Sequence, residues 1–117
     1  MTPINISEKL SRFSSHWDPH VVADYNRNDV MVVKFKGAFP FHKHDDTDDF
    51  FFVLSGRMTM EYEDRPVEVG TGEMIVIPRG TVRRPRAEDE VHVRLTEPKG
   101  EPNTGNSGAE PAPKPRI

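Results

Sequence analysis

The stretch FPFHKHDDTDDFFFVLSG, residues 39–56, places two histidines one residue apart and follows them with four aspartates and a run of phenylalanines. His42 and His44 lie two positions apart, so on an extended strand both side chains project to the same side. The apolar run Phe50–Leu54 has the length and composition of a strand that is buried on both faces. The stretch therefore predicts two strands joined by a solvated acidic loop, with a histidine pair on the first.

Further strand patterns occur on both sides of this stretch, separated by turn signals about every ten residues. Alternating or continuous apolar patterns are found at residues 30–36, 57–63, 67–69, 74–77 and 91–96. The segment 74–77 is predicted as another buried strand. In the last strand Val91, Val93 and Leu95 are expected to point inward and His92 outward. Seven or eight short strands at this spacing are typical of a sandwich, barrel or jelly roll.

The two ends of the chain have different patterns. Asn5 and Glu8 form a capping box, which predicts a short N-terminal helix that ends at Asp18-Pro19. One apolar face of this helix is expected to dock on the core: Ile6, Leu10, Phe13 and Trp17. After Glu97 the chain is rich in proline and glycine, so residues 99–117 are predicted to be a disordered tail. Residues 1–98 form the single predicted domain.

Composition limits the classes of function. The chain has 117 residues, a formal net charge of -3 and no cysteine, so nothing favours a nucleic-acid partner and thiolate chemistry is excluded. No apolar run approaches the roughly 20 residues that cross a bilayer. The first ten residues lack the basic and apolar regions of a signal peptide. We therefore expect a cytoplasmic protein without a membrane partner.

Two groups of residues at fixed spacing resemble the sequence motifs of the cupin superfamily. The first group is Gly37, His42-Lys43-His44, Asp49 and Gly56, and the second is Gly72, five residues, then Pro78-Arg79-Gly80. The chain is similar over residues 4–106 to small single-domain bacterial cupins of the mannose-6-phosphate-isomerase-like group. This resemblance implies an all-β fold, an antiparallel jelly-roll barrel (double-stranded β-helix) with the short helix at its N-terminus.

The resemblance also implies a site inside the barrel. In the family, two histidines and a glutamate of the first motif and a histidine of the second hold one divalent metal. His42 and His44 match, and the glutamate position falls on Asp49, with Asp48 as a second candidate if the register slips by one. The histidine of the second motif is replaced by Arg83.

Arg83 is a departure from the family pattern, because a guanidinium stays protonated and has no lone pair for a metal. Three interpretations stay open. His42, His44 and Asp49 can still form a facial triad for iron, manganese, nickel or zinc. Alternatively Arg83 pairs with Asp49 in a metal-free site, where the histidines bind a small molecule or act as an acid/base pair. In the third interpretation, these positions have no function.

The leading prediction is a cupin with a small-molecule pocket inside the barrel and an incomplete metal site. If it is an enzyme, it acts on a small polar or carboxylated substrate through His42, His44 and Arg83, by oxygenation, isomerisation or a lyase step. The alternatives are a metal-dependent oxygenase or isomerase and a non-catalytic binding or sensor module. The phenylalanines are expected to be mainly core, and the second face of Phe50–Val53 predicts a homodimer.

Overall fold

Seven strands and one short helix make up the chain in the computed structural model, which describes residues 1–117. The elements are α1 (Ile6–Leu10), β1 (His20–Tyr25), β2 (Asn28–Ala38), β3 (Asp49–Ser55), β4 (Arg57–Tyr62), β5 (Pro66–Gly70), β6 (Met74–Ile77) and β7 (Arg83–Pro98). The only helix, α1, is neither long nor apolar enough to cross a bilayer.

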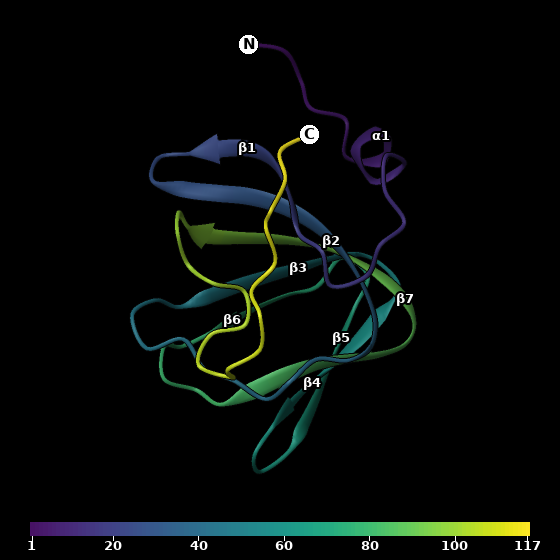
Figure 1. Cartoon of the computed structure of the whole chain (residues 1–117). Coiled ribbons are helices and arrows are strands. Elements are labelled where there is room, and N and C mark those ends of the chain that lie inside the picture. Colours follow the sequence, from purple (N-terminus) through teal and green to yellow (C-terminus); the bar gives the residue numbers. More distant parts are fainter.

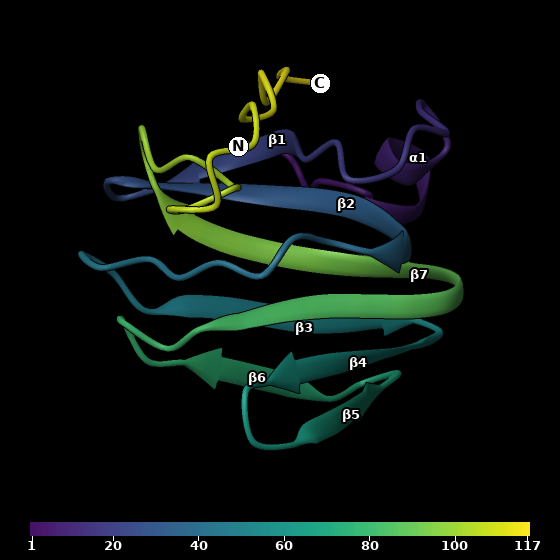
Figure 2. The ribbon, with the colours of Figure 1, turned by 60° about the horizontal axis from the view of Figure 1, so that its bottom comes forward.

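The strands pair antiparallel in the order β1-β2-β7-β3-β6, and β4 and β5 extend the sheet from the first part of β7. Residues Arg83–Arg86 of β7 pair with β4, whereas His92–Thr96 pair with both β2 and β3. The long strand β7 therefore curls around the barrel and joins its layers (Figures 1 and 2). This arrangement confirms the predicted jelly-roll fold, although the sequence did not reveal Arg83–Arg86 as part of a strand.

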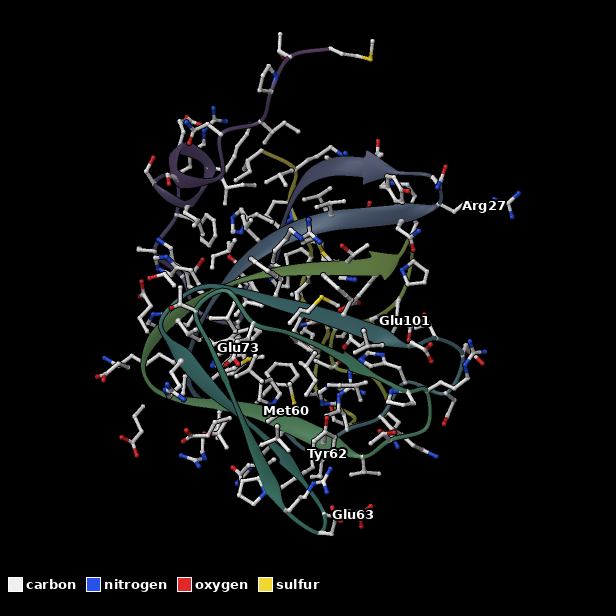
Figure 3. All side chains as sticks on the ribbon, turned by 180° about the vertical axis from the view of Figure 1, so that it is seen from behind. Arg27, Met60, Tyr62, Glu63, Glu73 and Glu101 are labelled. Carbon is white, nitrogen blue, oxygen red and sulfur yellow. The ribbon has the colours of Figure 1, made fainter.

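The two hairpins β1–β2 and β4–β5 extend from different parts of the barrel. Arg27 lies in the β1–β2 turn and Glu63 follows β4 at the tip of the other hairpin, far from Arg27 (Figure 3). In the β1–β2 turn, Asn26 has a φ of 53°. That left-handed conformation suits asparagine and matches the twist of a tight hairpin.

The barrel interior is filled by side chains that alternate along the strands. The main core has 14 buried residues: Val21, Met31, Val33, Phe35, Phe51, Val53, Met58, Met60, Val69, Ile77, Ala87, Val91, Val93 and Leu95. The inward positions of Val91, Val93 and Leu95 are as predicted. His92 points outward, where its Nε2 lies 2.8 Å from a Glu90 carboxylate oxygen.

Two motif glycines occupy conformations that other residues avoid. Gly56 has a φ of 96°, and a Cβ there would lie 3.2 Å from the Glu90 carbonyl oxygen. Gly80 has a φ of 78° and follows Pro78 in a turn that the Thr81 amide closes by donating to the Pro78 carbonyl. These positions explain why glycines occur at this spacing.

The prediction that both faces of β3 and β6 are buried does not hold within a single chain. In β3, Phe51 and Val53 are buried, but Phe50 and Phe52 on the other face are only half-buried. In β6, Met74 is 57% exposed. These side chains lie on the outer face of the sheet, beyond the part near Leu54 that packs against Leu10 and Val32. The phenylalanine run is therefore only partly core.

The N-terminal helix is shorter than predicted. The Asn5 cap is confirmed, because its side chain accepts a hydrogen bond from the Glu8 amide. The helix ends at Leu10 rather than at Asp18-Pro19, and the Ser11 hydroxyl there donates to the Glu8 carbonyl. Serine side chains compete for backbone groups in this way and shorten helices.

Residues 99–117 pack against the barrel. The Val21 amide donates to the Pro115 carbonyl, and the Ile117 amide donates to the Val21 carbonyl. Thr104 is buried, and the end of the segment, in yellow in Figure 1, bridges to β1 between Val21 and Arg116. This packing differs from the disorder that the composition predicts. Side-chain and backbone contacts with distant residues hold the segment, and composition does not report such contacts.

Candidate ligand site inside the barrel

The backbone places His42 opposite Arg83. The His42 amide donates to the Arg83 carbonyl at 3.0 Å, and the Arg83 amide donates to the His42 carbonyl at 2.9 Å. Two residues that exchange both hydrogen bonds sit directly opposite each other in an antiparallel pair. Both side chains are buried, so the arginine of the second motif does face the histidine pair.

His44 is held from two directions. Its carbonyl accepts a hydrogen bond from the Gly80 amide at 2.8 Å, which ties the turn of the second motif to the first. Its Nδ1 lies 2.8 Å from a carboxylate oxygen of Glu101, in the C-terminal segment. The Nε2 atom is buried without a hydrogen-bond partner and lies 3.7 Å from Asp49 Oδ2. Glu101 is labelled in Figure 3.

Asp49 and Arg83 form a buried ion pair. Asp49 is 3% exposed and Arg83 is 1% exposed, and Arg83 Nη2 donates to Asp49 Oδ2. The Phe50 amide also donates to Asp49, at 3.1 Å. Burial raises the pKa of Asp49, and the adjacent guanidinium opposes that shift. A charged pair in this environment is held by its mutual attraction and hydrogen bond, and each partner depends on the other.

His42 is a neutral imidazole at physiological pH. Its Nδ1 lies 2.8 Å from the Pro40 carbonyl, a contact that only an N–H can make, so Nε2 carries the lone pair. Burial lowers the pKa of His42 to about 4, and the nearby charge of Arg83 acts in the same direction. His42 therefore presents a hydrogen-bond acceptor to the interior.

Glu97 is a further buried acid that the motif comparison did not single out. It is 3% exposed, and burial raises its pKa to about 8, with the charge of Asp49 adding to the shift. Its Oε2 atom has no hydrogen-bond partner, although Lys114 Nζ lies 3.7 Å away. The inward alternation of Val91, Val93 and Leu95 extends to position 97, and this was the available signal in the sequence.

A small cavity lies between these groups and a set of aromatic rings. The centre of a water-sized sphere can move within about 30 Å³ of this cavity, which is enough room for one or two waters. It is lined by Trp17, Pro19, Val33, Phe35, Phe39, His42, Asp49, Phe51, Pro85, Leu95, Glu97 and Asn103. Apolar walls with a few placed polar groups are typical of a small-molecule site.

The donor set does not fit a divalent metal. No group of three or more His, Cys, Asp or Glu side chains is arranged to hold an ion. Asp49 Oδ2 already accepts from Arg83, and the guanidinium supplies positive charge beside the two histidines. The two imidazoles alone keep a free nitrogen, since His44 Nε2 is buried without a partner and His42 uses only Nδ1. A metal would have to displace Arg83 from its carboxylate.

The structure brings together all four residues predicted for the site, His42, His44, Asp49 and Arg83. The alternative Asp48 lies outside it, with a carboxylate oxygen that accepts from the Arg79 amide. The neighbouring arginines of the second motif also point elsewhere. Arg84 and Arg86 both donate to one carboxylate oxygen of Glu61, so they do not form a cradle for an anion.

The sequence and structure have known relatives. The cupin-domain family model matches residues 29–97, more than half of the chain, and the chain therefore belongs to the cupin family. It is 30% identical over 83 residues to an uncharacterized protein, YdbB, of Bacillus subtilis (strain 168), covering 70% of this chain and 67% of that protein.

Two crystal structures share the fold at higher coverage. A cupin-2 domain containing protein from Shewanella frigidimarina is 38% identical with a TM-score of 0.81, covering 82% of this chain and 94% of that one. Protein NMB1881 from Neisseria meningitidis is 26% identical with a TM-score of 0.76, covering 84% and 100%. These relatives establish a small single-domain cupin.

Proposed function

We propose that this cupin binds a small polar organic molecule inside its barrel without a metal. The observation that carries the proposal is the Asp49–Arg83 pair. An arginine occupies the position at which the family supplies its last metal-binding histidine, and it bonds to the carboxylate that would be a ligand. The polar and aromatic lining of the adjacent cavity supports a ligand there.

The same cavity supports an acid/base role on such a ligand. His42 and Glu97 both line it, and burial moves the pKa of His42 down to about 4 and that of Glu97 up to about 8. Titratable groups whose environments separate their pKa values are candidates for base and acid. A neutral imidazole accepts a proton, and a protonated carboxyl donates one, as an isomerisation or lyase step requires.

Metal analysis of Arg83→His tests the metal-free site. We expect the wild-type protein, purified without chelator and reconstituted with iron, manganese, nickel or zinc, to hold far less than one ion per chain. Arg83→His should gain an ion, because the new imidazole completes a set with His42 and His44. Arg84→His is the matched control and should gain none, because Arg84 bonds to Glu61 instead. Near-stoichiometric metal in the wild type, lost in His42→Ala, would overturn the proposal.

We also propose that the outer face of the sheet joins two copies of this chain. Met74 and Val76 are 57% and 50% exposed on β6, which is an edge strand. Beside them, the guanidinium of Arg94 lies 5.2 Å from the ring centroid of the half-buried Phe50. An exposed apolar face of this kind marks an interaction surface.

Sedimentation velocity tests the dimer. The wild type should sediment as a dimer, and Val76→Asp should sediment as a folded monomer, because a carboxylate would be buried at the interface. Thr59→Asp, at a half-buried position of β4 away from this face, is the control and should leave the dimer intact. A monomeric wild type at micromolar concentration would contradict the proposal.

A further inference from the structure

The polar atoms that face the cavity are mainly hydrogen-bond acceptors. His42 presents the lone pair of Nε2, and Asp49 and Glu97 present carboxyl oxygens. The one aromatic donor in the lining is already used, since Trp17 Nε1 donates to the Lys36 carbonyl at 2.9 Å. A ligand that matches this lining must therefore bring donors of its own.

Aromatic rings make up part of the cavity lining. The Trp17 ring stacks on Phe35 with centroids 4.3 Å apart, and it lies 5.0 Å from the ring of Phe39. Phe51 completes the apolar lining. Rings of this kind attract cations through their negative faces, and the attraction is strongest where water is excluded.

The chain itself places an ammonium group beside Glu97, although Lys114 is not among the residues that line the cavity. Lys114 has a positive φ of 52°, uncommon for a residue with a side chain, and its side chain is only 13% exposed. Its Nζ donates to the Glu101 carbonyl and lies 3.7 Å from Glu97 Oε2. That distance is too long for a hydrogen bond, so Glu97 keeps an unused acceptor.

We propose that the barrel recognises a small organic ammonium ion, which takes the place of Lys114 beside Glu97 and the aromatic rings. This inference rests on the proposed function, that the barrel binds a small molecule, and names the class of that molecule. The charge balance favours a cation. Arg83 is neutralised by Asp49, and an ammonium beside Glu97 would favour the ionised form of that carboxyl, as the charge of Lys114 already does.

The cavity must widen to admit such a ligand, and the C-terminal segment is the part that can move away. Asn103 lines both the cavity and an outer groove that also includes Trp17 and Phe39. Asn103 is held within the segment by the Ala112 amide, which donates to its side-chain oxygen at 2.8 Å. Release of Lys114 would free the chain that carries Asn103, and the groove would then open onto the cavity.

The test uses three matched probes, propylammonium, propanol and propionate, titrated into the full-length protein and followed by amide chemical shifts. We expect propylammonium to bind best, with perturbations at His42, Glu97 and Trp17. Lys114→Met should tighten its binding at least tenfold, because the internal competitor is removed. Glu97→Gln should weaken it at least tenfold. Lys99→Met removes a tail lysine that pairs with Asp24 and Asp29, which do not line the cavity, and it should change the affinity less than twofold.

The outcomes separate this inference from the proposed function. Tighter binding of propanol or propionate at the same residues would overturn the ammonium class and leave a small-molecule pocket. Unchanged propylammonium affinity in Lys114→Met would overturn the exchange with Lys114. If none of the three probes perturbs the cavity residues in either the wild type or Lys114→Met, the proposed pocket itself fails. Amide spectra of each variant without probe confirm its fold.

Discussion

The interior and the outer surface of this barrel both contain an arginine–carboxylate pair, and the two pairs differ almost completely in their surroundings. Inside, Arg83 and Asp49 have side chains that are 1% and 3% exposed. Outside, Arg57 on β4 and Glu68 on β5 are 3.0 Å apart, with side chains 64% and 63% exposed. Similar chemistry in water and in a desolvated core has different energetic consequences.

The comparison shows how a buried carboxylate can be neutralised by a side chain of the same protein. Where the barrel interior provides a buried carboxylate, some positive charge must compensate it. A guanidinium does this as a metal ion would, and it occupies the carboxylate oxygen that a metal ion would bind. The exposed pair has water as an alternative partner, so its loss leaves no group unsatisfied.

The largest expected effect is on the interior pair. Asp49→Ala should lower the free energy of unfolding by about 3–5 kcal/mol, because it leaves the Arg83 guanidinium buried without its partner. The double variant Asp49→Leu with Arg83→Met should recover most of this loss, because no charge then remains buried. Urea denaturation of the single and double variants measures both values. A loss below about 1 kcal/mol in Asp49→Ala would mean that the two pairs are equivalent.

An intermediate effect is expected from the pH dependence of stability. In the unfolded chain Glu97 ionises near its ordinary pKa of 4.5, while in the folded chain it keeps its proton up to about pH 8. The folded state therefore binds more protons between these values, and stability should fall as the pH rises from about 4.5 to 8. Between pH 4.5 and pH 8, the difference in free energy of unfolding between Glu97→Gln and the wild type should shift in favour of the variant by ~2–4 kcal/mol.

His42 contributes a dependence of opposite sign, which serves as the internal control. Its pKa is about 4 in the folded chain, against an ordinary value of 6.5 that applies when the chain is unfolded, so the unfolded chain binds the extra proton between these values. Stability should therefore fall as the pH drops from 6.5 to 4. The variant Glu97→Gln should show the same fall, because it still contains His42. Thermal unfolding of both proteins across the pH range separates the two groups. Parallel curves for the two proteins would contradict the assignment to Glu97.

The smallest effect is expected from the exposed pair. Arg57→Ala should change the free energy of unfolding by less than about 1 kcal/mol, because an ion pair in water gains little over its solvated partners. Added salt should leave even this difference smaller. Urea denaturation at low and high salt provides the measurement. A loss comparable to that of Asp49→Ala would remove the distinction between the inside and the outside of the barrel.

Much of the fold followed from local patterns. The alternation of Val91, Val93 and Leu95 predicted which side faces the core, and the Asn5 cap predicted the start of the helix. Local patterns failed where a face had no covering layer. The apolar residues Met74 and Val76 read as a buried strand, but burial depends on what packs against a strand. A sequence pattern cannot show that this outer face lies bare in one chain.

The sequence predicted only part of the candidate site, because local patterns do not report contacts between distant segments. The two-residue spacing of His42 and His44 and the motif positions of Asp49 and Arg83 identified the interior group. The C-terminal contributors were missed, because Pro/Gly-rich composition indicates only that a segment cannot form its own core. Glu101 reaches His44 across 57 positions of sequence. Such a contact exists only when the segment lies along the barrel.

Through its resemblance to cupins, the sequence implied the jelly-roll barrel and an arginine where a metal ligand is expected. By itself it determined the short alternating strands and the spacing that puts His42 and His44 on one side of a strand. These are consequences of spacing, alternation and residue chemistry, which act over a few neighbouring positions. Only the tertiary structure decided that Arg83 bonds to Asp49, that Glu97 is buried beside a cavity, and that Lys114 Nζ lies 3.7 Å from Glu97. Each of these contacts joins residues that are far apart along the chain, and barrel closure alone brings them within the range of a hydrogen bond or an ion pair.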